Sequence, residues 1–128
     1  VFESTRSFFT NTIQPLKLED ISNEEIEKNI LSIYAKLYHK YEADKQYIPE
    51  RNLIEVKFED FEADALAMTE NIYQKLSIPG FEEAREAIEK YVGGKKGYKK
   101  NKYKYDDRTV QLVQDNWDFA LKQWDYSL

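Results

Sequence analysis

A regular spacing of apolar side chains between residues 22 and 43 restricts this chain to folds that cover one face of a long helix. The apolar residues recur at steps of three and four, as Ile26, Ile30, Ile33, Tyr34, Leu37, Tyr38 and Tyr41. Ser22 and Glu25 form a capping box, in which each side chain takes up an otherwise unpaired amide. The pattern predicts an amphipathic helix of about five turns that ends near Ala43 and buries one face.

Four further stretches have helical spacing. The first carries Phe2, Phe8, Phe9 and Ile13 and ends near Pro15. The next two cover residues 65–76 and 81–91, and Gly93-Gly94 is expected to break the second of them. The last begins at a cap formed by Asp106 or Asp107 and continues through Val110, Val113, Trp117, Ala120, Leu121 and Trp124.

One stretch has the two-residue alternation of a β-strand. Residues 52–58, NLIEVKF, place Ile54, Val56 and Phe58 on one side and Leu53, Glu55 and Lys57 on the other. This pattern predicts a half-buried strand at or near a sheet edge. A single strand cannot make a sheet, and the first helix has no N-cap before Val1. We therefore expect a fragment of a longer domain, mainly α-helical with one clear strand.

The composition excludes several classes of site. The chain lacks cysteine, so it has no disulfide or thiolate metal site, and its single histidine, His39, excludes a histidine cluster. We expect no metal. No apolar run approaches the ~18 residues of a membrane span. Glu3 and Arg6 interrupt any signal peptide, so we expect a cytoplasmic protein without a membrane span in this portion.

Residues 95–104, KKGYKKNKYK, hold six lysines and no acidic residue. The remaining residues include 13 basic and 24 acidic side chains, so binding of nucleic acid over the whole surface is not expected. Lysines this close repel one another unless an anion is present. Gly97 allows close approach of the backbone, and Tyr98 adds aromatic surface. A solvated loop, a site for a small polyanion and a nucleic-acid contact all remain possible at this level.

Several segments resemble, in order, the C-terminal part of a known family. VFESTRSFF is similar to the 3′-phosphate segment of bacterial sulfotransferases that use 3′-phosphoadenosine 5′-phosphosulfate, and LIEVKFEDF resembles their strand ending in Tyr-Glu-Asp-Leu. ALAMTENIYQKLSIPGFEEA looks like the helix and turn that follow. KKGYKKNKYKY stands where the family has a late basic loop, and WDFALKQWDY resembles its last helix.

The resemblance implies an α/β, P-loop-like fold for the full protein, with residues 1–128 as the C-terminal portion of one sulfotransferase domain. It also implies transfer of a sulfuryl group to a hydroxyl or amine of a small-molecule or glycan acceptor, and a role for this portion in 3′-phosphate binding. The residues that would bind the co-substrate are Ser4, Phe58, Lys95, Lys96, Gly97, Tyr98 and Lys99. Catalytic residues and the 5′-phosphosulfate loop are expected upstream.

Two departures from the family pattern bear on these roles. Phe58 stands where the family usually has Tyr, so only ring contact with the adenine is expected. The family's Arg-x-Pro, which precedes the matched serine, would fall just before Val1. The alternative function is a non-enzymatic helical module whose lysine-rich loop binds RNA, an anionic lipid or an acidic partner.

Overall fold

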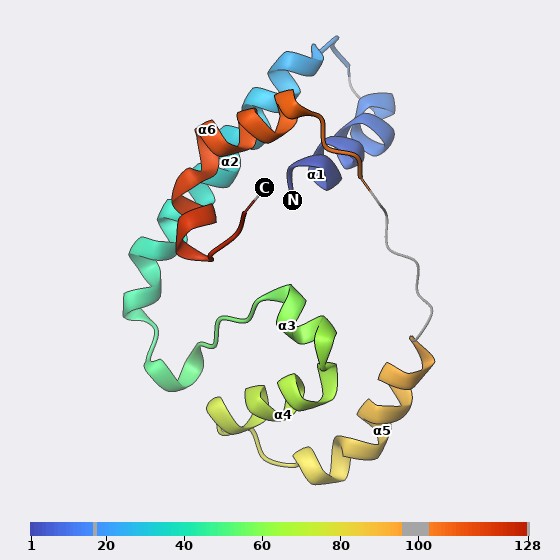
Figure 1. Cartoon of the computed structure of the whole chain (residues 1–128), viewed down its shortest axis with the longest axis vertical. Helices are drawn as coiled ribbons and strands as arrows, with labels where there is room; N and C mark the ends of the chain where they lie inside the picture. The colour runs from blue at the N-terminus through green and yellow to red at the C-terminus, as the bar shows by residue number, and fades with distance from the viewer. Residues whose placement is uncertain (17, 96–102, 128) are drawn as a thin grey trace. The chain divides into compact units, whose positions relative to one another are not determined.

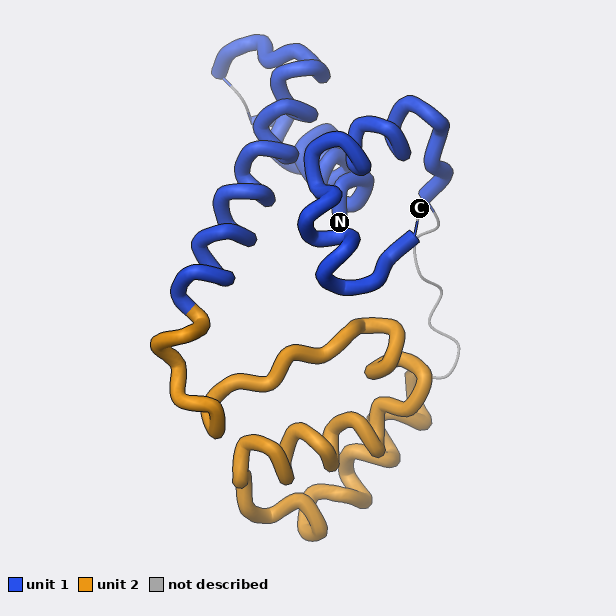
Figure 2. The backbone as a smooth tube through the Cα atoms, turned by 60° about the vertical axis from the view of Figure 1, so that its left-hand side comes forward, with its two compact units in different colours: residues 1–44, 101–128 blue, residues 45–100 orange. Residues whose placement is uncertain are grey.

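The computed structural model describes residues 1–16, 18–95 and 103–127, and these residues form helices and connecting segments with no β-strand among them. The chain divides into two units, shown in different colours in Figure 2. Unit 1 comprises Val1–Asp44 and Asn101–Leu128, and unit 2 comprises Lys45–Lys100. The mainly helical character predicted from the sequence is confirmed.

Three α-helices build the described part of unit 1. The first, α1 (Phe2–Phe8), continues as a π-helical turn (Phe9–Ile13) and a 3-10 turn (Gln14–Leu16). The long helix α2 (Asn23–Asp44) follows, and α6 (Asp107–Gln123) closes the unit. Both α1 and α6 pack against α2 (Figure 1). The chain segments from the two ends of the sequence therefore share one core.

The helix starts in this unit follow the predicted capping. The Glu25 amide donates to Ser22 Oγ at 3.2 Å, and the Ser22 amide donates to Glu25 Oε2 at 3.0 Å. These bonds satisfy amides that a helix N-terminus leaves without an intrahelical partner. At the start of α6, Asp106 Oδ1 accepts from the Thr109 amide at 2.7 Å. The predicted caps are confirmed, with Asp106 rather than Asp107 as the cap of α6.

Trp117 lies at the centre of the core of unit 1 and is 4% exposed. Its indole Nε1 donates to the Leu31 carbonyl oxygen at 3.1 Å. The Tyr34 ring lies 4.0 Å from the Trp117 ring, centroid to centroid, and the Phe2 ring meets it edge-on at 5.9 Å. Ile26, Ile30, Leu31 and Val113 complete the buried cluster. A buried indole N–H needs a partner, so this hydrogen bond fixes the position of α6 along α2.

The buried face of α2 is rotated relative to the predicted one. Ile33 and Leu37 belong to the predicted face, but they are 50% and 65% exposed. Leu31 and Glu27 are buried in their place. The reason is that Glu27 accepts hydrogen bonds from both neighbouring helices, and this turns its side of α2 towards them.

Glu27 joins all three helices of unit 1. Arg108 of α6 binds it in a bidentate manner, with Nη2 at 2.6 Å from Oε2 and Nη1 at 3.2 Å from Oε1. Arg6 of α1 donates to Glu27 Oε1 at 3.0 Å and also pairs with Glu3. The hydrogen bonds from Arg108 and then those from Arg6 hold the pKa of Glu27 below its ordinary value of 4.5, although burial opposes this shift.

The described residues of unit 2, 45–95, form three α-helices and two short 3-10 turns. The turns are Lys45–Tyr47 and Glu50–Asn52, and the helices are α3 (Phe58–Ala63), α4 (Ala65–Lys75) and α5 (Phe81–Gly94). Phe81 is buried against Tyr73, with ring centroids 5.3 Å apart. Arg85 of α5 pairs with Glu70 of α4 at 3.4 Å. The helix α5 does not stop before the glycine pair but continues through Gly94.

The strand predicted at residues 52–58 is wrong for this structure. Asn52 ends a 3-10 turn, Leu53 is extended with φ −138° and ψ 133°, and Phe58 is already the first residue of α3. An isolated extended segment forms no ladder of hydrogen bonds, and no strand among the described residues lies beside it. Glu59 and Asp60 lie in the first turn of α3, where negative side chains interact favourably with the positive end of the helix dipole.

We expect Glu27→Gln to lower the free energy of unfolding at pH 7 by about 1–3 kcal/mol, because charged hydrogen bonds to two arginines are replaced by neutral ones. Glu27 has a lowered pKa in the folded state. Its contribution is therefore complete above about pH 4.5 and is lost as the pH falls through that lowered pKa.

Urea titrations of the wild type and the variant between pH 7 and pH 3 measure this difference. Asp118→Asn is the control, since Asp118 pairs with Lys122 on the exposed side of α6 and such pairs contribute about 0–1 kcal/mol. Identical loss of stability with falling pH in the wild type and in Glu27→Gln would contradict the expectation.

Candidate functional site

Unit 2 has a groove of about 820 Å³ at the place where α3 turns into α4 beside the end of α5. A volume of this size is within the ~300–1,000 Å³ of ordinary small-molecule sites. Its walls are mainly apolar and aromatic. The lining residues are Phe58, Phe61, Glu62, Ala63, Asp64, Ala65, Leu66, Tyr91, Val92 and Lys95.

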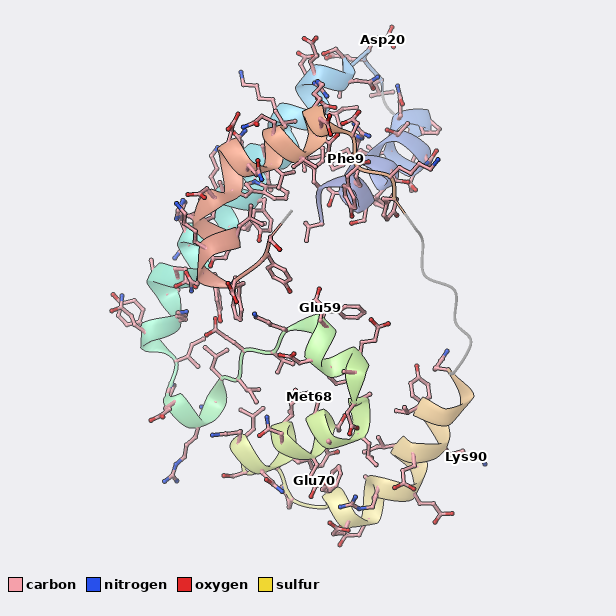
Figure 3. All side chains as sticks on the ribbon, in the orientation of Figure 1. Phe9, Asp20, Glu59, Met68, Glu70 and Lys90 are labelled. Carbon is pink, nitrogen blue, oxygen red and sulfur yellow. The ribbon has the colours of Figure 1, made fainter. Side chains whose placement is uncertain are left out.

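The corner between α3 and α4 shapes one wall of the groove. Asp64 is the residue between the two helices, and its φ of −148° and ψ of 84° break the helical path. Its Oδ1 accepts from the Ala67 amide at 3.0 Å, which caps α4. Figure 3 labels Glu59 on α3 and Met68 on α4, on the two sides of this corner. Phe58, the first residue of α3, is 60% exposed.

The end of α5 supplies the other wall. Tyr91 is 67% exposed, and Lys95 follows it one helical turn later. The Lys95 Nζ lies 5.2 Å from the centroid of the Tyr91 ring, a cation–π distance. Glu62 and Asp64 add carboxylates to the lining, so charges of both signs surround an aromatic groove. This combination suits a flat aromatic ring that carries an anionic group towards the lysine.

The structure brings together two of the predicted site residues, Phe58 and Lys95, which lie 37 positions apart in the sequence and line the same groove. Four others, Lys96, Gly97, Tyr98 and Lys99, lie outside the described residues. Ser4 belongs to unit 1, on the exposed side of α1, and its Oγ donates to the Val1 carbonyl oxygen at 2.8 Å.

Eight of the ten lining residues were not predicted as part of a site, among them the aromatic residues Phe61 and Tyr91. Phe61 stood in the motif LIEVKFEDF without a role of its own, and Tyr91 was assigned to the buried face of its helix. The available signal was the spacing of Tyr91 and Lys95, since residues four apart on a helix lie on the same face.

The described residues give no indication of a metal site or a membrane helix. No group of three or more histidine, aspartate or glutamate residues in the described ranges is arranged to hold a metal ion. None of the helices seen there is long and apolar enough to cross a bilayer. His39 is an exposed residue of α2 whose ring lies 4.5 Å from that of Phe119.

Comparison with known proteins supports the predicted resemblance to sulfotransferases. A sequence model described as "Sulfotransferase family" matches residues 1–83. Two curated relatives, from Mycobacterium bovis and Mycobacterium tuberculosis, are each 21% identical over 109 residues and are named omega-hydroxy-beta-dihydromenaquinone-9 sulfotransferases. The alignment covers 85% of this chain and 28% of each relative. No solved structure matches significantly.

Substitution of Asp64 tests whether its side chain stabilises the start of α4 at the corner of the groove. We expect Asp64→Ala to lower the free energy of unfolding by about 1 kcal/mol, because the Ala67 amide loses its capping partner. Asp64→Ser can restore an oxygen acceptor at the same place and should recover most of the loss. Urea titration of the three proteins measures both effects, and equal stabilities of the alanine and serine variants would contradict the capping role.

Proposed function

Because this chain belongs to the sulfotransferase family, we propose that it is the C-terminal portion of one sulfotransferase domain with an α/β, P-loop-like fold, and that it helps to bind 3′-phosphoadenosine 5′-phosphosulfate. The chain spans 28% of the length of the curated relatives. A whole domain would then supply the remaining parts of the site. The observation that carries the proposal is the groove shared by Phe58 and Lys95.

The groove fits the adenosine end of the co-substrate. Phe58 and Tyr91 are exposed aromatic residues that line the groove, and stacking of a base on an aromatic ring contributes about 1–3 kcal/mol. Leu66 and Val92 provide apolar surface around the ring. In this proposal the phenyl ring of Phe58 contacts the adenine without the hydroxyl that the family's usual tyrosine would add.

The 3′-phosphate is proposed to lie at the Lys95 end of the groove. Lys95 is the described start of the basic stretch, and Lys96, the Gly97 amide, Tyr98 and Lys99 are proposed to complete the phosphate contacts. Ammonium groups and backbone amides together are suited to a doubly charged phosphate. Ser4 is proposed as a further hydroxyl donor on the ground of the sequence resemblance alone, and its Oγ here donates to the Val1 carbonyl oxygen at 2.8 Å.

The proposed reaction is an in-line transfer. The oxygen of an acceptor hydroxyl, or the nitrogen of an acceptor amine, forms a bond to the sulfur atom while the bond from sulfur to the bridging phosphate oxygen breaks. The leaving electron pair remains on 3′,5′-adenosine bisphosphate, and the acceptor proton passes to a base expected outside this chain. Positioning and stabilisation of negative charge carry most of such catalysis. The named relatives act on a hydroxylated acceptor, and we propose a small-molecule hydroxyl here.

The groove's aromatic wall can be tested by calorimetric titration with 3′,5′-adenosine bisphosphate, in a polypeptide that contains the whole domain. We expect Phe58→Ala to weaken binding by about tenfold through loss of stacking. Tyr47→Ala is the matched control, because Tyr47 is an aromatic residue of the same unit that is 80% exposed and outside the groove. Equal affinities of the Phe58 and Tyr47 variants would remove the groove from the nucleotide site.

The charged end of the site is tested separately. We expect the combined substitution Lys95→Ala and Lys96→Ala to weaken binding of the bisphosphate by at least tenfold at low salt, and by less as salt screens the charges. The matched control is the combined substitution Lys75→Ala and Lys90→Ala, which removes the same amount of charge from α4 and α5 and should leave the affinity for the bisphosphate nearly unchanged. Unchanged affinity in the first pair would exclude the basic stretch from phosphate binding.

A further inference from the structure

The ammonium group of Lys95 lies against an aromatic ring at the end of α5. Its Nζ is over the Tyr91 ring, 5.2 Å from the centroid. Tyr91 and Lys95 are four positions apart, a spacing that places two residues on one face of a helix. Both residues also line the groove of unit 2. The contact therefore places a positive charge at the wall of the groove.

The carboxylates of the groove make the partner of Lys95 important. Glu62 and Asp64 line the same groove. An ammonium group that pairs with a carboxylate has its charge neutralised and part of its N–H donors occupied. An aromatic ring attracts the cation through its quadrupole and leaves the charge in place. Because its Nζ lies over the Tyr91 ring, Lys95 keeps its charge for an incoming anion.

The helical turn between Tyr91 and Lys95 contains the glycine pair. A Cβ added to Gly93 or Gly94 would meet no described neighbour within 4 Å. Glycine is a poor helix former because it has the most backbone freedom to lose. The Lys95 amide donates to the Val92 carbonyl oxygen at 3.0 Å, which fixes the backbone but not the side chain. The ring contact is therefore what holds the Lys95 side chain to the helix.

A lysine that is already in place binds an anion with a smaller loss of freedom. Ordering a long, flexible lysine side chain is among the largest side-chain entropy costs. Contacts that hold a group in its bound position before the ligand arrives raise the affinity by lowering this cost. Tyr91 is 67% exposed, and a cation–π contact at an exposed site corresponds to about two- to fivefold in an equilibrium constant. Titration can measure an effect of this size.

We propose that Tyr91 is a positioning residue, which acts through Lys95 to favour nucleotides that carry a 3′-phosphate. This inference rests on the proposed sulfotransferase function, in which Lys95 lies at the 3′-phosphate end of the groove. Stacking of the adenine on an aromatic ring strengthens the binding of every adenine nucleotide alike. Placement of Lys95 strengthens only those with the 3′-phosphate. The choice of ligand therefore separates the two contributions of Tyr91.

The test compares two ligands by calorimetric titration of a polypeptide that contains the whole domain. The ligand 3′,5′-adenosine bisphosphate has the 3′-phosphate, and adenosine 5′-monophosphate lacks it. The ratio of their dissociation constants measures the preference for the 3′-phosphate, and any loss of stacking cancels in this ratio. We expect Tyr91→Leu to lower the preference by about two- to fivefold. Tyr91→Phe keeps the ring and should retain the preference.

A double-mutant cycle shows whether Tyr91 acts through Lys95. In the Lys95→Ala background, Tyr91→Leu should leave the preference unchanged, because no ammonium group remains for the ring to hold. Tyr47→Leu is the matched control, since Tyr47 is an 80% exposed tyrosine of the same unit that lies outside the groove. This control should not change the preference in either background.

Two results would overturn the proposal. Equal weakening of both ligands by Tyr91→Leu would make Tyr91 a stacking surface only. An equal loss of preference with and without the Lys95 ammonium group would show that Tyr91 acts through another residue. Because Tyr91 is mostly exposed, its substitution is not expected to lower the melting temperature, and a thermal scan of each variant checks this.

The outcome is separable from that of the proposed function. Without nucleotide, the ring current of Tyr91 should shift the NMR signals of the Lys95 ε-methylene protons upfield, and Tyr91→Leu should remove this shift. Absence of the shift in the wild type would contradict the contact itself. Failure of the wild type to bind the bisphosphate would reject the nucleotide site. Normal binding with an unchanged preference in Tyr91→Leu would reject the role of Tyr91 alone.

Discussion

The arrangement of unit 1 depends on one buried carboxylate. Glu27 of α2 is 7% exposed and accepts hydrogen bonds from Arg6 of α1 and Arg108 of α6, residues that lie 21 and 81 positions away in the sequence. Taking a carboxylate out of water is costly unless every oxygen is paired, so the three helices stay in the one arrangement that pairs it. The orientation of α1, and with it the placement of Ser4 and Phe8, follows from this requirement.

The sequence predicts what is local in this fold. The capping box at Ser22 and the cap at Asp106 involve residues three positions apart, so their geometry can be read from spacing alone. The rotated face of α2 could not be predicted in this way, because it depends on two arginines from other helices. The strand failed for a related reason: alternation at residues 52–58 indicates which side chains could share a face, but a strand exists only beside another strand.

In the candidate site, too, local motifs could be predicted from the sequence, whereas the contacts between helices could not. Phe58 and Lys95 were each identified from a motif, and only the packing of α3, α4 and α5 shows that they line one groove. Tyr91 was missed because an aromatic residue at helical spacing is usually part of a core, whereas this one stands near the helix end and remains 67% exposed.

The single-residue corner at Asp64 has an evolutionary consequence. Because Asp64 alone separates α3 from α4, one residue inserted or deleted inside α3 would rotate Phe58 by about 100° around the α3 axis relative to this corner. Phe58 would then point away from the groove even though every helix remained intact. We therefore expect homologous chains that keep this groove to vary in length at the surface turns and to conserve the number of residues between Phe58 and Leu66.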